Sequence, residues 1–138
     1  MDQRALYKGV WDQLSADKPL VILAGPRQAG KTTFAKEIAA KDFSDTIYLN
    51  WDLPKDKRRL IEDPVFFSKE PKSSVSSRPL VILDEIHKYR DWKNYLKGIY
   101  DQFAGEYQFL VTGSGRLEFS RKAGDSLAGR FLKFHIFP

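Results

Sequence analysis

The chain has 138 residues, no cysteine and a formal net charge of +5 at pH 7. This length predicts one domain with a sizeable hydrophobic core, and the lack of cysteine excludes disulfides and thiolate metal sites. No apolar run approaches the roughly 20 residues that a membrane span requires, and the N-terminus lacks the apolar core of a signal peptide. We therefore expect a cytoplasmic protein that makes no membrane contact.

Taken in chain order, apolar runs alternate with segments of helical periodicity. Helices are expected at residues 2–15, 31–40, 55–62, 63–67 and 92–103. Strands are expected at residues 20–24, 46–50, 80–83, 108–112 and 131–137. The strand at Leu20–Ala24 is apolar at every position, as is typical of a parallel strand covered on both faces. The pattern predicts an α/β fold of three layers, in which helices cover both faces of a five-stranded, mainly parallel sheet.

A glycine-containing loop joins the first strand to the next helix. It contains G-x-x-x-x-G-K-T, the pattern of a phosphate-binding loop, in the strand-to-helix context that this function requires. Backbone N–H groups of such a loop form an anion nest, and the helix N-terminus adds partial positive charge. The residues expected to contact the nucleotide are Gly25, Pro26, Arg27, Gln28, Ala29, Gly30, Lys31, Thr32 and Thr33. Lys31 is expected to reach the β- and γ-phosphates, and Thr32 to bind Mg²⁺. A plain turn with a stray lysine is the alternative.

Two adjacent carboxylates follow the strand at residues 80–83. In a phosphate-loop protein the strand-terminal aspartate, here Asp84, holds Mg²⁺ through its water shell. Glu85 lies one residue further on, where it can polarise a water molecule for in-line attack. A helix-capping pair is the alternative interpretation. The pair predicts a metal ligand, Asp84, and a catalytic base, Glu85.

Polar and basic residues follow the fourth strand. Ser114 or Thr112 can position the attacking water, unless Gly-Ser-Gly is a turn without such contact. Arg116 or Arg130 can neutralise charge in the transition state, in the same chain or across to a neighbouring copy in a homo-oligomer. His87 is expected at the edge of the site, without the role of general base.

Residues Lys55–Arg59 form the one tight basic cluster of the sequence. A cluster of this size is usually a solvated helix face. Contact with the phosphates of a nucleic acid is the alternative that the net charge raises.

Three motifs together resemble the AAA-type P-loop ATPases of archaea and bacteria, in particular the group related to STAND and origin-recognition ATPases. These motifs are Gly-Pro-Arg-Gln-Ala-Gly-Lys-Thr-Thr, Leu-Asp-Glu-Ile-His-Lys and Thr-Gly-Ser-Gly-Arg. The resemblance implies ATP and Mg²⁺ as ligands. It also implies a five-stranded core whose phosphate-loop strand is central, next to both the Asp84–Glu85 strand and the Thr112–Ser114 strand.

Members of this group usually continue beyond the equivalent of Pro138 into a helical region and a C-terminal domain, which is often winged-helix-like. The resemblance therefore implies that residues 1–138 form the N-terminal ATPase core of a longer protein. It also implies that the missing domain selects a protein or DNA partner. Residues of the helical lid cannot be assigned in this chain.

The function expected from these motifs is Mg²⁺-dependent ATP hydrolysis used as a nucleotide switch. Another class of phosphate-loop protein, a GTPase or a small-molecule kinase, is the first alternative. The sequence has no Asn-Lys-x-Asp or Thr-Lys-x-Asp motif to read a guanine base, and adjacent carboxylates favour hydrolysis over transfer to a second substrate. A nucleotide-gated module that binds DNA or protein with little turnover is the second alternative.

Overall fold

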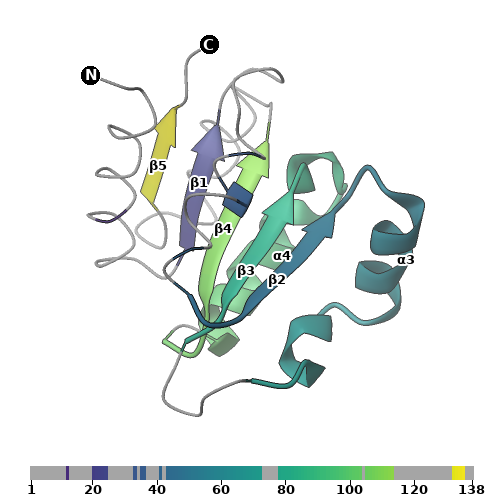
Figure 1. Cartoon of the computed structure of the whole chain (residues 1–138). Coiled ribbons are helices and arrows are strands. Elements are labelled where there is room, and N and C mark those ends of the chain that lie inside the picture. The colour runs from purple at the N-terminus through teal and green to yellow at the C-terminus, as the bar shows by residue number, and fades with distance from the viewer. Residues whose placement is uncertain are drawn as a thin grey trace.

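A computed structural model of the chain describes residues 12, 20–24, 33, 35–36, 41, 43–72, 78–103, 105–113 and 132–135, drawn in colour in Figure 1. Except for Asp12, which is helical and exposed, the helix expected at residues 2–15 lies outside this part of the chain, as does most of the one expected at 31–40. The described residues include a parallel sheet and the helices that follow its second and third strands.

The sheet is built from parallel strands in the order β2-β3-β4-β1-β5. Their bounds are β1 Leu20–Ala24, β2 Thr46–Asn50, β3 Leu80–Asp84, β4 Gln108–Gly113 and β5 Leu132–His135. Buried side chains fill β1 from Leu20 to Leu23 and all of β3 and β4. The α/β class and the parallel sheet expected from the apolar runs are therefore confirmed.

The position of β1 differs from the one that the family resemblance implied. β1 lies between β4 and β5, and β4 separates it from β3. The chain leaves β1 for the far edge of the sheet at β2, and β3 and β4 then fill the space back toward β1 (Figure 1). An apolar run shows that a strand is buried but carries no information on its neighbours, so this order was not accessible from the strand sequences.

Helix α4, Trp92–Phe103, covers one face of the sheet with its apolar side (Figure 1). Because successive side chains of a strand point to opposite faces, Leu49, Leu83 and Val111 face α4 and belong to its core cluster. The residues next to these in the sequence point to the other face of the sheet; they include Tyr48, Asp84 and Thr112. Of the helical layer expected on that second face, only residues 33, 35 and 36 are described, and Ala35 is fully buried.

Helix α3, Pro54–Glu62, and the short 3-10 helix η3, Phe66–Lys69, follow the edge strand β2. η3 begins later than the helix expected at residues 63–67. Asp63 instead has an extended backbone and ends α3, so Pro64 lies outside η3; the Pro64 carbonyl accepts a hydrogen bond from the Tyr95 hydroxyl at 2.7 Å. Phe67, in η3, lies edge-on among the rings of Phe103, Tyr107 and Phe109, with centroid separations of 5.0, 5.1 and 5.4 Å.

Candidate functional site

The carboxyl ends of β1, β3 and β4 meet at one edge of the sheet. Ala24 of β1 pairs with Gly113 of β4, and Leu83 of β3 pairs with Val111 of β4. Asp84 and Thr112, one residue further along, therefore lie beside each other at the edge where β1 leads into residues 25–33. Ligands of open parallel sheets bind at this edge, where the strand order reverses.

The Asp84 carboxylate is buried and receives two hydroxyl donors. The residue is 1% exposed, and Thr112 on β4 donates a hydrogen bond to Oδ1. Tyr48 on β2 donates to Oδ2 at 2.5 Å. Buried polar groups require such partners. Two strands thus fix the orientation of one carboxylate, at the sheet face opposite α4.

Glu85 turns the chain sharply away from the end of β3. Its backbone adopts φ 60° and ψ 29°, the left-handed region that residues other than glycine rarely occupy. Its N–H donates to the Thr112 hydroxyl oxygen at 3.2 Å. The single hydroxyl of Thr112 therefore accepts from Glu85 and donates to Asp84, which fixes the two carboxylate-bearing residues relative to each other.

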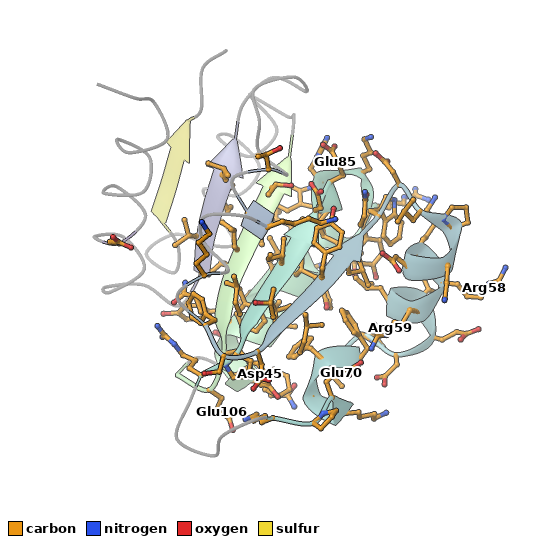
Figure 2. The ribbon with its side chains drawn as sticks, viewed as in Figure 1. Asp45, Arg58, Arg59, Glu70, Glu85 and Glu106 are labelled. Carbon is orange, nitrogen blue, oxygen red and sulfur yellow. The ribbon has the colours of Figure 1, made fainter. Side chains whose placement is uncertain are left out.

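The Glu85 side chain lies beside two basic residues of η4, the 3-10 helix Ile86–Lys88. Its Oε2 is 3.5 Å from Lys88 Nζ and 3.8 Å from His87 Nδ1. In Figure 2 Glu85 lies at the sheet edge opposite the one near Asp45 and Glu106. The Glu85 carboxylate thus lies just past the end of β3 with His87 beside it, and the roles expected for both residues stay predictions.

Lys88 connects this turn to the end of β2. Its ammonium group contacts both carboxylate oxygens of Asp52, at 2.8 and 2.9 Å. The hydrogen bond that Lys88 donates to Asp52 and the nearby charge of Glu85 hold the pKa of Lys88 above its ordinary value of 10.5. The Trp51 N–H donates to the Asp84 carbonyl at 3.0 Å. These contacts tie the ends of β2 and β3 together around the site.

Some of the site residues predicted from the sequence are described by the structure, and others are not. Asp84, Glu85 and Thr112, the last of these one of two alternatives for the water-positioning residue, lie together at one edge. Thr33 is helical and exposed. The other candidates lie outside the described residues and stay predictions: Gly25, Pro26, Arg27, Gln28, Ala29, Gly30, Lys31, Thr32, Ser114, Arg116 and Arg130.

Sequence reasoning missed Tyr48. The segment Thr-Ile-Tyr-Leu-Asn was interpreted only as a strand, although its period of two places Thr46, Tyr48 and Asn50 on one face. Asn50 pairs with Asp84 in the parallel register, so Tyr48 lies on the same face as that carboxylate. The signal in the sequence was a polar side chain, that of Tyr48, on the same face of the strand as Asn50. Its link to Asp84 could be inferred only by knowing that β2 lies next to β3.

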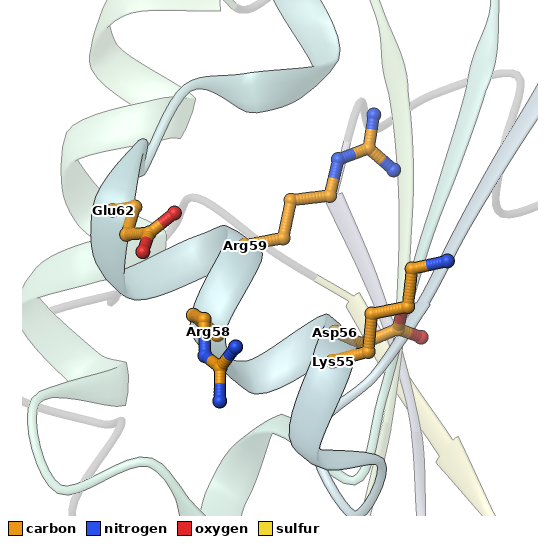
Figure 3. A pocket seen from close by; sticks show the side chains of 5 residues that line it. All are labelled: Lys55, Asp56, Arg58, Arg59 and Glu62. Atoms are coloured by element: carbon orange, nitrogen blue, oxygen red, sulfur yellow. The ribbon is translucent and has the colours of Figure 1, made fainter.

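The basic cluster expected from the sequence lies on the outer surface of α3. Figure 3 shows the side chains lining a shallow pocket of about 450 Å³ there, namely Lys55, Asp56, Arg58, Arg59 and Glu62. Arg59 forms an ion pair with Glu70, and its guanidinium carbon lies 4.6 Å from the Phe66 ring centroid. Lys55 and Arg58 are exposed. The cluster is thus solvated at Lys55 and Arg58, whereas Arg59 packs against the protein; contact with a nucleic acid stays a prediction.

The geometry at the strand ends agrees with the comparisons to known proteins. A family model described as an AAA domain matches residues 17–138, and the chain belongs to that family. The chain is 29% identical over 121 residues to an uncharacterised protein of Methanocaldococcus jannaschii, covering 85% of this chain and 26% of that protein. It is 33% identical over 112 residues to uncharacterised proteins of Mycobacterium bovis and Mycobacterium tuberculosis, covering 81% of this chain and 23% of each. The chain thus spans about a quarter of the length of these relatives.

Two solved structures share the fold. The Walker-type ATPase PABY2304 of Pyrococcus abyssi superposes with a TM-score of 0.66 at 16% identity, over 98% of this chain and 53% of that one. A DNA polymerase III gamma subunit-related protein of Thermotoga maritima gives 0.59 at 15% identity, over 98% and 46%. The AAA-type character suggested by the motifs is confirmed by the family match; the finer grouping with STAND and origin-recognition ATPases stays a prediction. Within the described residues, no helix combines the length and apolar character needed to cross a membrane.

Proposed function

We propose that residues 1–138 are an AAA-type ATPase core that binds ATP with Mg²⁺, hydrolyses it in the cytoplasm, and serves as a nucleotide switch. The observation that carries this proposal is the Thr112 hydroxyl group, which bonds both Asp84 and Glu85 at the edge where β1 leads into Gly25–Thr33. A candidate metal ligand and the backbone of a candidate base are thereby held near the end of β1, the strand that precedes G-x-x-x-x-G-K-T in the sequence.

The residues at this edge suit a magnesium–nucleotide complex. Mg²⁺ prefers oxygen ligands, keeps several of its waters and binds through one or two carboxylates together with phosphates. A carboxylate has about four lone-pair positions, so Asp84 can accept from Thr112 and Tyr48 and still face a hydrated cation. Thr32 would supply a second oxygen. Bound Mg²⁺ would neutralise the charge on the β- and γ-phosphates.

The other roles follow from placement. Lys31 and the loop amides would hold the phosphates. Glu85 would accept a proton from the attacking water, with Ser114 or Thr112 orienting that water and Arg130 or Arg116 neutralising developing charge. The left-handed backbone at Glu85 supports this assignment, because strained backbone persists chiefly where the surroundings enforce it for function.

Two variants test the proposal, each with a matched control. Lys31→Ala should abolish binding of a fluorescent ATP analogue, whereas Lys41→Ala, which removes an exposed lysine, should not. Glu85→Gln should keep nucleotide binding and lose phosphate release, whereas Glu106→Gln, at the opposite edge of the sheet, should keep both (Figure 2). Tight ATP binding by the Lys31→Ala variant would contradict the proposal.

A competition between ATP and GTP for the wild-type chain separates the ATPase from the GTPase alternative.

The nucleotide-gated binding module is supported by the exposed Lys55 and Arg58 of α3. If these residues contact DNA phosphates, affinity for a DNA duplex should fall steeply with salt. Salt-independent binding would count against that contact, and retained nucleotide binding without turnover would favour the module over the hydrolase.

A further inference from the structure

The proposed function gives the Tyr48 hydroxyl group no role of its own. It donates to Asp84 Oδ2 at 2.5 Å, while Thr112 donates to Oδ1. The two oxygens of the carboxylate are thus each held by a hydroxyl group from a strand on either side, β2 and β4. Donors on both oxygens restrict rotation of the carboxylate about its own axis as well as its displacement.

The Tyr48 ring also contacts the helical segment that follows the phosphate-loop sequence. The Lys36 ammonium group lies 4.0 Å from the ring centroid, a distance typical of a cation–π contact. Lys36 is only a few residues from Thr32 and Thr33 in the sequence. Tyr48 therefore touches Asp84 with its hydroxyl group and the segment after the loop with its ring.

We propose that Tyr48 is a positioning residue. It orients the Asp84 carboxylate for metal binding and fixes the position of that carboxylate relative to the segment that follows the phosphate loop. This inference rests on the proposed function. A hydrogen-bond partner of a metal ligand orients that ligand, and removing such a partner typically lowers metal affinity or activity by about 10- to 100-fold. Tyr48 is expected to act in this way, through Asp84 rather than by touching nucleotide.

The test measures metal affinity without requiring turnover. Mn²⁺, which replaces Mg²⁺ at oxygen sites and is followed by its paramagnetic resonance signal, is titrated into the 138-residue chain saturated with a non-hydrolysable ATP analogue. Tyr48→Phe keeps the ring and its contact with Lys36 but loses the hydroxyl group. It should weaken Mn²⁺ affinity by about 10-fold or more, while metal-free nucleotide binding stays near the wild-type value.

Tyr95→Phe is the matched control, because it also removes a tyrosine hydroxyl group that donates at 2.7 Å, here to the Pro64 carbonyl on the α4 side. Its Mn²⁺ affinity should equal that of the wild type. In an Asp84→Asn background, Tyr48→Phe should have no further effect on Mn²⁺ affinity, since the interaction runs through that carboxylate. A purely structural role would instead weaken both backgrounds alike.

A second substitution guards against a folding defect. Tyr48→Leu also removes the hydroxyl group, so its Mn²⁺ affinity should fall as that of Tyr48→Phe does. If the phenylalanine variant does not fold, the leucine variant takes its place in the titration. Equal Mn²⁺ affinities for the donor-free variant and the wild type, or a higher affinity without the hydroxyl group, would overturn the inference alone. A wild-type chain that binds no nucleotide would overturn the proposed function as well.

Discussion

The hydroxyl group of Thr112 donates a hydrogen bond to the carboxylate of Asp84, so the second-to-last residue of β4 holds the last residue of β3. The same oxygen accepts the Glu85 N–H at 3.2 Å. All three residues are buried or nearly so. One side chain thus satisfies a backbone donor at a turn and a carboxylate at a strand end, which makes the site and the stability of the sheet edge depend on the same atom.

Thr112→Val should lower the free energy of unfolding by about 1–3 kcal/mol, because a buried N–H group and a carboxylate each lose a hydrogen-bond partner. Thr112→Ser keeps the hydroxyl group and loses one methyl group, for which about 0.8 kcal/mol is expected. Urea denaturation of the two variants measures the difference. A valine variant as stable as the serine variant would show that the hydrogen bonds contribute nothing to folding.

Glu85→Gly should make the protein more stable while removing turnover. The left-handed backbone costs a residue other than glycine about 1–2 kcal/mol, and glycine avoids this cost. Glycine also lowers the free energy of unfolding by about 0.5–1 kcal/mol, because its unfolded state has more conformational entropy. The expected gain is therefore about 0.5–1 kcal/mol, seen as a higher thermal midpoint with phosphate release abolished.

The control is Glu106→Gly, at an exposed turn residue whose backbone is outside the left-handed region. This change brings only the entropic loss and should lower the thermal midpoint. If both glycine variants shift the midpoint in the same direction, the conformation of Glu85 is not a source of strain.

The elements set by local periodicity were predictable, and those set by distant contacts were not. α4 begins at Trp92 and ends at Phe103, the bounds expected from its apolar spacing, because its own amphipathic pattern determines which face is buried. β2 likewise spans the residues expected. The start of η3 was misplaced because Asp63 and Pro64 form a turn before the helix, in which the Phe66 N–H donates to the Asp63 carbonyl and the Val65 N–H donates to Asp63 Oδ1.

The candidate site was predictable in part for the same reason. Asp84 and Glu85 are found from a single strand and its end, without knowledge of neighbours. The contact of Tyr48 with Asp84 depends on β2 lying beside β3, and the Thr112 bridge depends on β4 lying on the other side. The order of strands is thus the information that the sequence motifs lacked, and it adds Tyr48 to the residues around the carboxylate.

Stability should fall with rising pH above about pH 10, in part because of Tyr95. Burial, followed by the nearby charges of Tyr89 and Asp63, raises the pKa of the Tyr95 hydroxyl group above its ordinary value of 10.0. Between the two pKa values the unfolded chain has lost this proton and the folded chain has kept it. The unfolded state then binds fewer protons, so the free energy of unfolding decreases as pH rises.

Urea denaturation at pH 8.5 and at about pH 10.5–11 measures this loss, and Tyr95→Phe should make it smaller. The absorbance of tyrosinate gives a second measure, because the folded variant should have one late-titrating tyrosine fewer than the wild type. Identical pH dependence for wild type and variant would contradict a raised pKa at Tyr95.

Arg58 and Arg59 are neighbours on α3 with the same charge, and their alanine variants should differ in stability. Arg59 pairs with Glu70 and lies over the Phe66 ring, whereas Arg58 projects into solvent (Figure 3). Because the Arg59 side chain is 41% exposed, solvent screens its ion pair, and Arg59→Ala should lose about 0.5–1 kcal/mol. Arg58→Ala should change stability by less than about 0.5 kcal/mol.

The two variants remove one positive charge each, so a long-range electrostatic effect would change both alike. A double-mutant cycle of Arg59→Ala with Glu70→Ala isolates the pair, and its coupling should shrink at 1 M salt, where charges are screened within about 3 Å. Equal stability losses for Arg58→Ala and Arg59→Ala would mean that the ion pair and ring contact add nothing. In that case the whole cluster, Arg59 included, would be a solvated surface free to meet a partner.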